Sequence, residues 1–218
     1  DINEAAAAKV VAEITAAGGK AVVNTSDITN YDDSLNAVKQ ALDSFGDLHA
    51  VVNNAGINRD RMFASMTEED WDLIMAVHLK GHFCISSHAV HYWRGKAKEG
   101  AEVSGRIINT TSGAGLQGSI GQSNYAAAKA GMHGFTKSLA LEVARKGITV
   151  NTVSPGYIAT EMVMAVREDI RQQIVAQIPV GRLGEPEEIA AAVAYLVSDE
   201  AGFVTGSNLS INGGQHMY

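Results

Sequence analysis

Short runs of β-branched and other apolar residues alternate with longer stretches of helical periodicity along the whole chain. The short runs lie at 21–27, 49–56, 105–113, 147–156 and 208–214, and the helical stretches at 4–17, 32–45, 67–93, 122–146, 161–176 and 186–198. A helix between consecutive strands favours parallel pairing, because the chain has to return across the sheet before the next strand begins. The pattern therefore predicts an α/β fold with a doubly wound parallel sheet.

Local signals mark where several helices begin. Thr67 is followed three residues later by Asp70, a spacing typical of a capping box, and Pro186 precedes two glutamates, which suits a first helical turn. The chain has no internal repeat or Pro/Gly-rich linker, and only three prolines occur in it. We expect a single domain over residues 1–218.

The N-terminus departs from the usual pattern of a dinucleotide-binding sheet. Such a sheet begins with a strand, a glycine-rich turn, a helix and a second strand, whereas this chain starts directly with the helical stretch DINEAAAAKVVAEI. We therefore expect a Rossmann-like sheet that lacks its first strand-helix-strand unit.

Composition and charge narrow the classes of function. Hydrophobic residues make up 46% and charged residues 19%, the balance of an ordinary globular protein. The formal net charge is -7 and no run of Lys or Arg occurs, so we expect no nucleic-acid partner. No window approaches the roughly 18 apolar residues of a membrane span, and the first residues do not resemble a signal peptide. These features predict a cytoplasmic protein with no membrane partner.

The stretch from Ser112 to Lys129 begins with a motif that has two interpretations. Gly113, Gly115 and Gly118 spell G-x-G-x-x-G, the pattern of a phosphate-binding turn. In such a turn a helix begins at the last glycine and an acidic residue follows about 20 residues later, and neither condition is met here. We interpret the three glycines as residues of a flexible loop.

The same stretch contains a second motif with a chemical rationale. Tyr125 and Lys129 are four residues apart and share one face of a helix, where an ammonium group favours phenolate and lowers the pKa of the phenol. Ser112, at the end of a strand, is expected to loop back beside Tyr125 and hydrogen-bond a carbonyl or carbinol oxygen. A proton-transferring phenol beside a carbonyl indicates hydride transfer. On these residues alone, an ordinary amphipathic helix with a surface lysine remains the alternative.

Three widely spaced motifs together point to one family. They are NNAG at 53–56, Ser112 with Tyr125-x-x-x-Lys129, and SPG at 154–156 followed by Thr160. With them, essentially the whole chain resembles the short-chain dehydrogenase/reductases. NNAGINRD, NTVSPGYIATEM and IPVGRLGEPEEIA are similar to 3-oxoacyl-ACP and acetoacetyl-CoA reductases, whereas VHLKGHF and RIINTTSGAGLQG are closer to D-3-hydroxyacyl-CoA dehydrogenases. The resemblance implies an oxidoreductase that interconverts a 3-oxoacyl thioester, carried by CoA or ACP, and its (3R)-3-hydroxyacyl form.

The resemblance also implies roles for the matching positions. Ser112 would orient the substrate oxygen, Tyr125 would act as general acid or base, and Lys129 would tune Tyr125 and hold the nicotinamide ribose. The positions expected to contact a nicotinamide cofactor are Asp27, Ile28, Asn53, Ala55, Gly56, Tyr125, Lys129, Pro155, Gly156, Ile158 and Thr160. The residues expected to form an apolar acyl channel are Met162, Val163, Met164 and Val166. By the same analogy, the enzyme assembles as a homotetramer.

His78 departs from the family pattern. Most relatives have Asn in the fourth catalytic position, within a pattern like N-L-x-G, whereas this chain reads HLKG at 78–81. We expect His78 to take that catalytic position, because histidine can hydrogen-bond a water leading to Lys129, although it can also carry charge.

Asp1 bears on the choice of cofactor. Its spacing from Asp27 matches the acidic position that closes the second strand of such sheets, where a carboxylate binds the ribose hydroxyls and repels a 2′-phosphate. This favours NAD(H), with NADP(H) possible. The alternative role for Asp1 is that of a helix N-cap.

The same residues leave two other functions and one kind of ligand as alternatives. One alternative is a dehydrogenase of another secondary alcohol, such as a steroid or sugar, and another is a non-catalytic truncated scaffold. His78 with His82, and His88 with His91, have spacings compatible with metal binding, but no cysteine or carboxylate partner is evident nearby. We expect no metal.

Overall fold

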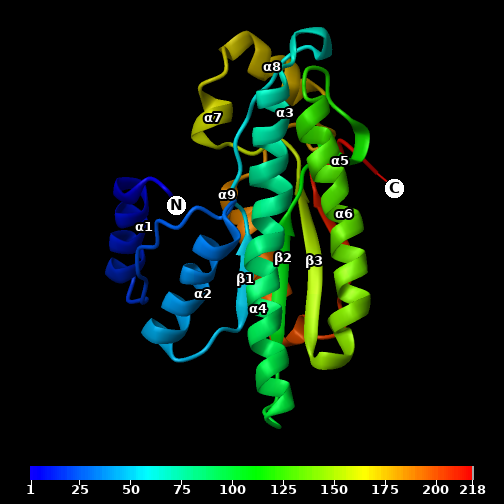
Figure 1. Ribbon diagram of the computed structural model, residues 1–218. Coiled ribbons are helices and arrows are strands. Elements are labelled where there is room, and N and C mark those ends of the chain that lie inside the picture. The colour runs from blue at the N-terminus through cyan, green and yellow to red at the C-terminus, as the bar shows by residue number, and fades with distance from the viewer. Residues whose placement is uncertain (218) are drawn as a thin grey trace.

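Four parallel strands form the central sheet of the computed structural model, which describes residues 1–217 (Figure 1). They are β1 (Ala50–Asn53), β2 (Gly105–Thr110), β3 (Ile148–Pro155) and β4 (Asn208–Ile211), adjacent in that order. All neighbouring pairs are parallel, with Val51 opposite Ile107 and Ile107 opposite Val150. The predicted α/β fold with a parallel sheet is confirmed.

Helices connect the strands and cover both faces of the sheet (Figure 1). They are α1 (Glu4–Ala16), α2 (Tyr31–Phe45), α3 (Glu68–Met75), α4 (Gly81–Lys98), α5 (Ala114–Gln117), α6 (Ser123–Val143), α7 (Glu161–Met164), α8 (Glu168–Ala176) and α9 (Pro186–Val197). The long helices α4 and α6 pack on one face, and α9 packs on the other. Of the helices in the described chain, none combines the length and the apolar character needed to cross a bilayer.

The side-chain alternation of β2 divides the core into two layers. Ile107 faces α4 and α6 in a cluster with Val150 and Trp93, whereas Ile108 faces α9 in a cluster with Leu196. These five residues are at most 2% exposed. Because successive strand residues point to opposite faces, a strand covered on both faces is apolar throughout, as the RII run of β2 nearly is.

We predicted one helix over 67–93, but the stretch is interrupted. It begins with the expected capping box at Thr67, but a π-turn at Ala76–Lys80 separates α3 from α4. The Gly81 N–H donates to the Ala76 carbonyl across this turn. A Cβ on Gly81 would lie 2.8 Å from Ile28 Cδ1, so α4 begins at a point where another segment approaches its backbone closely.

The predicted helix 161–176 is also interrupted, between α7 and α8. The Arg171 guanidinium donates to the carbonyls of Met164 and Val166, at 2.9 and 3.4 Å. In a continuous helix these carbonyls would accept hydrogen bonds from backbone N–H groups one turn later. The Arg171 guanidinium takes the place of those N–H donors at the interruption.

Residues 21–27 form no strand, so this part of the prediction is wrong. Side chains hold the backbone here: Gln40 of α2 donates to the Val23 carbonyl at 2.8 Å, and Asn24 bonds to Gln40 at 2.7 Å. The backbone nitrogen of Asp1 donates to the Asn24 carbonyl at 3.1 Å. A β-branched run becomes a strand only where a neighbouring strand supplies a ladder, and no strand of the described chain pairs with this run.

Removal of a side chain from the centre of the sheet should destabilise the protein strongly. Ile107 is fully buried on β2, so Ile107→Ala should lower the free energy of unfolding by about 2–5 kcal/mol through lost burial and a residual cavity. Ile120→Ala is the matched control: Ile120 is 89% exposed, and its truncation should change stability by less than about 0.5 kcal/mol. Urea denaturation measures both, and equal effects would contradict the assignment of the core.

Candidate active site

Strand ends and the start of a helix meet at one edge of the sheet. Ser112 follows β2 by two residues, Pro155 ends β3, and Tyr125 lies in the first turn of α6. All three line a cavity of about 180 Å³. The carboxyl ends of parallel strands meet at the same edge, which is where sheets of this class bind ligands. The structure therefore brings the predicted Ser112 and Tyr125 together at a cavity.

The G-x-G-x-x-G segment is a short helix, not the flexible loop that we expected. Its residues Ala114–Gln117 form α5, and the Gly113 N–H donates to the Pro155 carbonyl at 3.0 Å. A Cβ on Gly115 would lie 2.8 Å from the Lys129 carbonyl carbon. Gly115 is therefore required because α5 packs directly on the backbone of α6, at the turn that carries Lys129.

The half-buried Tyr125 phenol lies in surroundings that favour its protonated form. Burial raises its pKa above the usual value, the hydrogen bond with Ser112 lowers it in part, and the Asp60 carboxylate raises it further. We expected this pKa to be lowered by Lys129, but the net shift is upward because burial has the largest effect. The Lys129 ammonium lies 5.5 Å from the ring centroid and donates to the Thr110 carbonyl. The phenol therefore holds its proton and is suited to donate it.

The Lys129 side chain is buried beside Tyr125, with only 2% of the residue exposed. Its Nζ donates to the carbonyl of Thr110, the last residue of β2, at 2.7 Å, and burial lowers its pKa to about 8. An ammonium has three donors, and this carbonyl is the one acceptor found for it among residues 1–217. The remaining donors fit the hydroxyls of a bound ribose.

His78 lies against the Tyr125 ring. The two rings meet edge to face, with centroids 5.0 Å apart. His78 Nε2 is 2.7 Å from the carbonyl oxygen of Ile57 and 3.1 Å from the backbone nitrogen of Ile57. We place the proton on Nε2, because the contact with the carbonyl oxygen is the shorter one. Burial and the charge of Lys129 lower its pKa to about 4, so the ring is neutral near neutral pH.

The NNAG segment after β1 has one buried end and one exposed end. The Asn53 side chain points inward and donates to Ser86 Oγ at 2.9 Å and to Asn109 Oδ1 at 2.8 Å. Ala55 and Gly56 are exposed. Asn53 therefore supports the strand end from the interior, whereas Asn54, Ala55 and Gly56 are exposed, and Ala55 and Gly56 are the predicted cofactor residues with surface available to a ligand.

The predicted adenine-side residues do not line the cavity of Ser112 and Tyr125. The Asp27 carboxylate accepts hydrogen bonds from the backbone and hydroxyl of Thr29, both at 2.8 Å, and Ile28 packs against the start of α4. The Asp1 carboxylate accepts from the Asn3 N–H, and Asn3 is the N-cap of α1. Asp1 therefore does not take the alternative role of helix N-cap.

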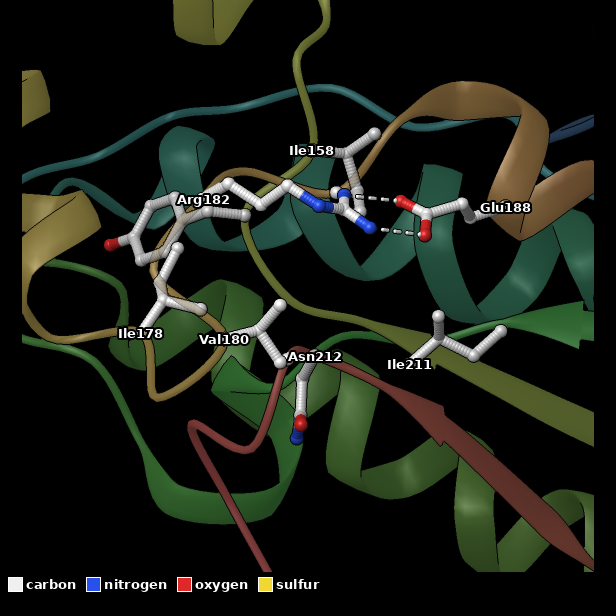
Figure 2. Close-up of a pocket in the computed structure, with 10 residues that line it drawn as sticks. Ile158, Ile178, Val180, Arg182, Glu188, Ile211 and Asn212 are labelled. Atoms are coloured by element: carbon white, nitrogen blue, oxygen red, sulfur yellow. Dashed lines mark hydrogen bonds and ion pairs between the residues drawn. The ribbon is translucent and has the colours of Figure 1, made fainter.

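The segment after β3 serves two cavities. Pro155 and Gly156 line the cavity of Ser112 and Tyr125, whereas Ile158 lines a neighbouring one of about 110 Å³. Figure 2 shows Ile158 beside the ion pair of Arg182 with Glu188, in which both guanidinium nitrogens reach the carboxylate, at 2.7 and 2.8 Å.

Thr160 lies further along the same segment. It is exposed and is the N-cap residue of α7. Neither Ile158 nor Thr160 lines the cavity of Ser112 and Tyr125.

Several polar residues of the cavity escaped the sequence analysis. They are Asn58, Gln117, Ser119, Gln122, Tyr157 and Gln215. Gln215 Oε1 accepts from the Tyr157 N–H at 3.3 Å, and Asn58 donates to the sulfur of Met162 at 2.9 Å. The position of Asn58 directly after NNAG-Ile was a usable signal, whereas Gln215 comes from a distant part of the chain and gave none.

Asn124, next to the catalytic candidate Tyr125, was also missed. It is fully buried and donates to the carbonyls of Arg59 and Asp70, each at 3.2 Å. These bonds tie the start of α6 to the loop after β1 and to α3, and so fix the position of the helical turn that carries Tyr125.

The residues expected to form an acyl channel are not part of the cavity lining. None of Met162, Val163, Met164 and Val166 lines the cavity of Ser112 and Tyr125. Met162 and Met164 are 61% and 49% exposed, and Met164 lines a separate surface cavity.

Among the described residues no group of three His, Cys, Asp or Glu side chains is placed to hold a metal ion.

A parallel α/β sheet with a hydroxyl, a phenol and a buried ammonium at its carboxyl edge places these groups where proteins of this fold class bind their ligands. A family model described as enoyl-(acyl carrier protein) reductase matches residues 1–216. Acetoacetyl-CoA reductase of Allochromatium vinosum is 44% identical over 217 residues, 99% of this chain and 86% of that protein. Acetoacetyl-CoA reductase of Cupriavidus necator is 47% identical over 90% of this chain and 77% of its own length. A 3-oxoacyl-[acyl-carrier-protein] reductase of Vibrio cholerae is 49% identical over 87% of this chain and 75% of its own length.

The chain belongs to the short-chain dehydrogenase/reductase family. It is an oxidoreductase of a family whose reductases use nicotinamide cofactors.

The buried neutral His78 should make the protein less stable in acid. Its pKa is about 4 in the fold against 6.5 for the free side chain, so the unfolded chain binds the proton more tightly. This contribution to stability is complete above about pH 6.5 and is lost as the pH falls to about 4. Urea denaturation across this range should give a smaller loss for His78→Asn than for the unsubstituted protein. Identical pH slopes would contradict the assignment.

Proposed function

We propose that this protein reduces the C3 carbonyl of a 3-oxoacyl thioester, carried by CoA or ACP, to the (3R)-3-hydroxyacyl form. The observation that supports it most is the convergence of the Ser112 hydroxyl and the protonated Tyr125 phenol on one cavity. Two hydroxyl donors at one point fit the oxygen of a ketone. The relatives named acetoacetyl-CoA reductase and 3-oxoacyl-[acyl-carrier-protein] reductase support the same substrate class.

The side chains have distinct roles in the proposed reaction. Ser112 and Tyr125 hydrogen-bond the C3 oxygen and orient the carbonyl. Tyr125 then transfers its proton to this oxygen as negative charge develops there. The Lys129 ammonium, 5.5 Å from the ring centroid, stabilises the phenolate that remains. A bound nicotinamide cofactor supplies the hydride that C3 receives.

The residues present fit the nicotinamide half of such a cofactor. We assign Lys129 to the ribose, and Ala55, Gly56, Pro155 and Gly156 to the surfaces around the ring. The fit does not extend to the phosphates: the glycine motif at 113–118 packs on α6 and offers no phosphate-binding turn.

The long helices support the proposal of a homotetramer. Two surface cavities lie along α4 and α6, and both are lined in part by Phe83 and Phe135. Phe83 is 46% exposed, and Leu141 on α6 is 86% exposed. Apolar side chains gathered on paired helices favour association of chains. We also propose that the enzyme works in the cytoplasm.

Removal of the Tyr125 hydroxyl tests the proposed chemistry. Tyr125→Phe should reduce turnover of acetoacetyl-CoA by about 10²–10⁴-fold, because the proton donor is lost, while NADH binding stays within about two-fold. Tyr195→Phe is the control, since Tyr195 is a half-exposed tyrosine on α9. Oxidation of NADH follows turnover, and titration calorimetry follows binding. Loss of NADH binding in Tyr125→Phe would refute the assigned role. Faster turnover of a steroid or sugar alcohol than of the thioester by the unsubstituted protein would refute the proposed substrate.

We propose NAD(H) as the preferred cofactor, with NADP(H) as the alternative. Asp1 and Asp27 both carry exposed carboxylates, and a carboxylate near the adenosine ribose repels a 2′-phosphate. The ratio kcat/KM should be at least about 10-fold higher with NADH than with NADPH. Asp1→Asn should lower the ratio of kcat/KM with NADH to kcat/KM with NADPH, because it removes one carboxylate that repels the 2′-phosphate. A higher kcat/KM with NADPH would contradict the proposal.

A further inference from the structure

One row of polar side chains on the helix pair around the π-turn faces the segment that follows β1. The row is Ser86, His82 and His78, each four residues from the next. Three contacts join Asn53 Nδ2 to Ser86 Oγ at 2.9 Å, His82 Nε2 to the Ala55 oxygen at 3.2 Å, and His78 Nε2 to the Ile57 oxygen at 2.7 Å. Every second residue of the segment 53–57 is therefore held by this row.

The spacing of the row matches the spacing of the segment. Four residues of an α-helix advance about 6.0 Å, and two residues of extended chain advance at most about 6.6 Å. The contacts run in opposite order along the two segments, since Ser86 meets residue 53, His82 meets residue 55 and His78 meets residue 57. His82 occupies the middle of the row, so it controls the register between its two ends.

The surroundings of His82 leave it one polar contact. The side chain is fully buried, and no described residue bonds its Nδ1. A buried polar group is costly unless it is hydrogen-bonded, so the Ala55 carbonyl is the interaction that offsets the burial of the imidazole. Burial and the charge of Lys129 lower the pKa of His82 to about 3, which keeps the ring neutral. A neutral ring that bonds a carbonyl through Nε2 carries its proton there.

We propose that His82 is a positioning residue that sets the register of the segment 53–57 against α4 through the Ala55 carbonyl. The inference rests on the proposed function, which assigns Ala55 and Gly56 of this segment to the cofactor. His82 touches neither substrate nor cofactor; it acts by holding the backbone that does. Its loss should weaken cofactor binding more than it slows turnover.

Three substitutions on one helix test this role. His82→Leu removes the donor and keeps an apolar side chain in the buried site. His82→Gln restores an N–H at the reach of Nε2. His88→Leu is the matched control, because His88 is also buried on α4 and its Nε2 bonds a backbone carbonyl at 2.7 Å, but that carbonyl belongs to Tyr31 of α2.

Two measurements on the full chain separate positioning from general stability. Hydrogen–deuterium exchange without cofactor should be about 5- to 10-fold faster at residues 53–58 in His82→Leu, since one hydrogen bond is lost. The KM for NADH should rise by a similar factor while kcat stays within about two-fold. His82→Gln should recover most of both changes. His88→Leu should speed exchange at the start of α2 and leave residues 53–58 unchanged.

Three outcomes would overturn the inference, two from the exchange rates and one from the glutamine variant. The first is unchanged exchange at residues 53–58 in His82→Leu, and the second is an equal effect of His82→Leu and His88→Leu on that segment. Failure of His82→Gln to restore the unsubstituted behaviour would likewise show that the Nε2 donor is not what matters. If the unsubstituted protein does not reduce acetoacetyl-CoA, the proposed function fails, but the exchange measurement still decides whether His82 positions the segment.

Discussion

The bond from the Lys129 ammonium to the Thr110 carbonyl is the interaction on which the site depends. A buried cation is costly unless its donors are used, and the last carbonyl of β2 is the acceptor within reach. This bond ties the first turns of α6 to the end of the central strand. Tyr125 lies one helical turn before Lys129, so its position at the cavity follows from the same bond.

Two glycines make room for the side chains that surround this bond. A Cβ on Gly115 would collide with the backbone at Lys129, and a Cβ on Gly56 would lie 2.6 Å from the His78 ring. Neither glycine needs a left-handed backbone, since neither has a positive φ. Both are therefore explained by close approach: one lets α5 pack on α6, and the other lets His78 lie between the Tyr125 ring and the segment after β1.

Sequence periodicity predicted the elements that a local pattern determines, and it missed the features that depend on contacts with distant segments. The parallel sheet followed from alternating apolar runs and helices, and the spacing of Tyr125 and Lys129 placed both on one helix. The run 21–27 has the composition of a strand, but strand formation needs a pairing partner that composition does not reveal. The π-turn before Gly81 and the contacts of His82 are likewise set by packing between segments distant in sequence. The direction of the Tyr125 pKa depends on burial, which the spacing of two side chains could not give.

Burial acts on Tyr125 and Lys129 in ways that favour carbonyl reduction. It raises the pKa of the phenol and lowers that of the amine, because both charged forms lose hydration. Before reaction, the phenol is therefore protonated and ready to donate. After donation, the phenolate faces a cation across a poorly screened interior, where attraction between opposite charges is stronger than in water. In the proposed reaction, the burial that holds the proton on Tyr125 at rest would also strengthen the attraction between the phenolate and the Lys129 ammonium once the proton has moved to the ketone oxygen.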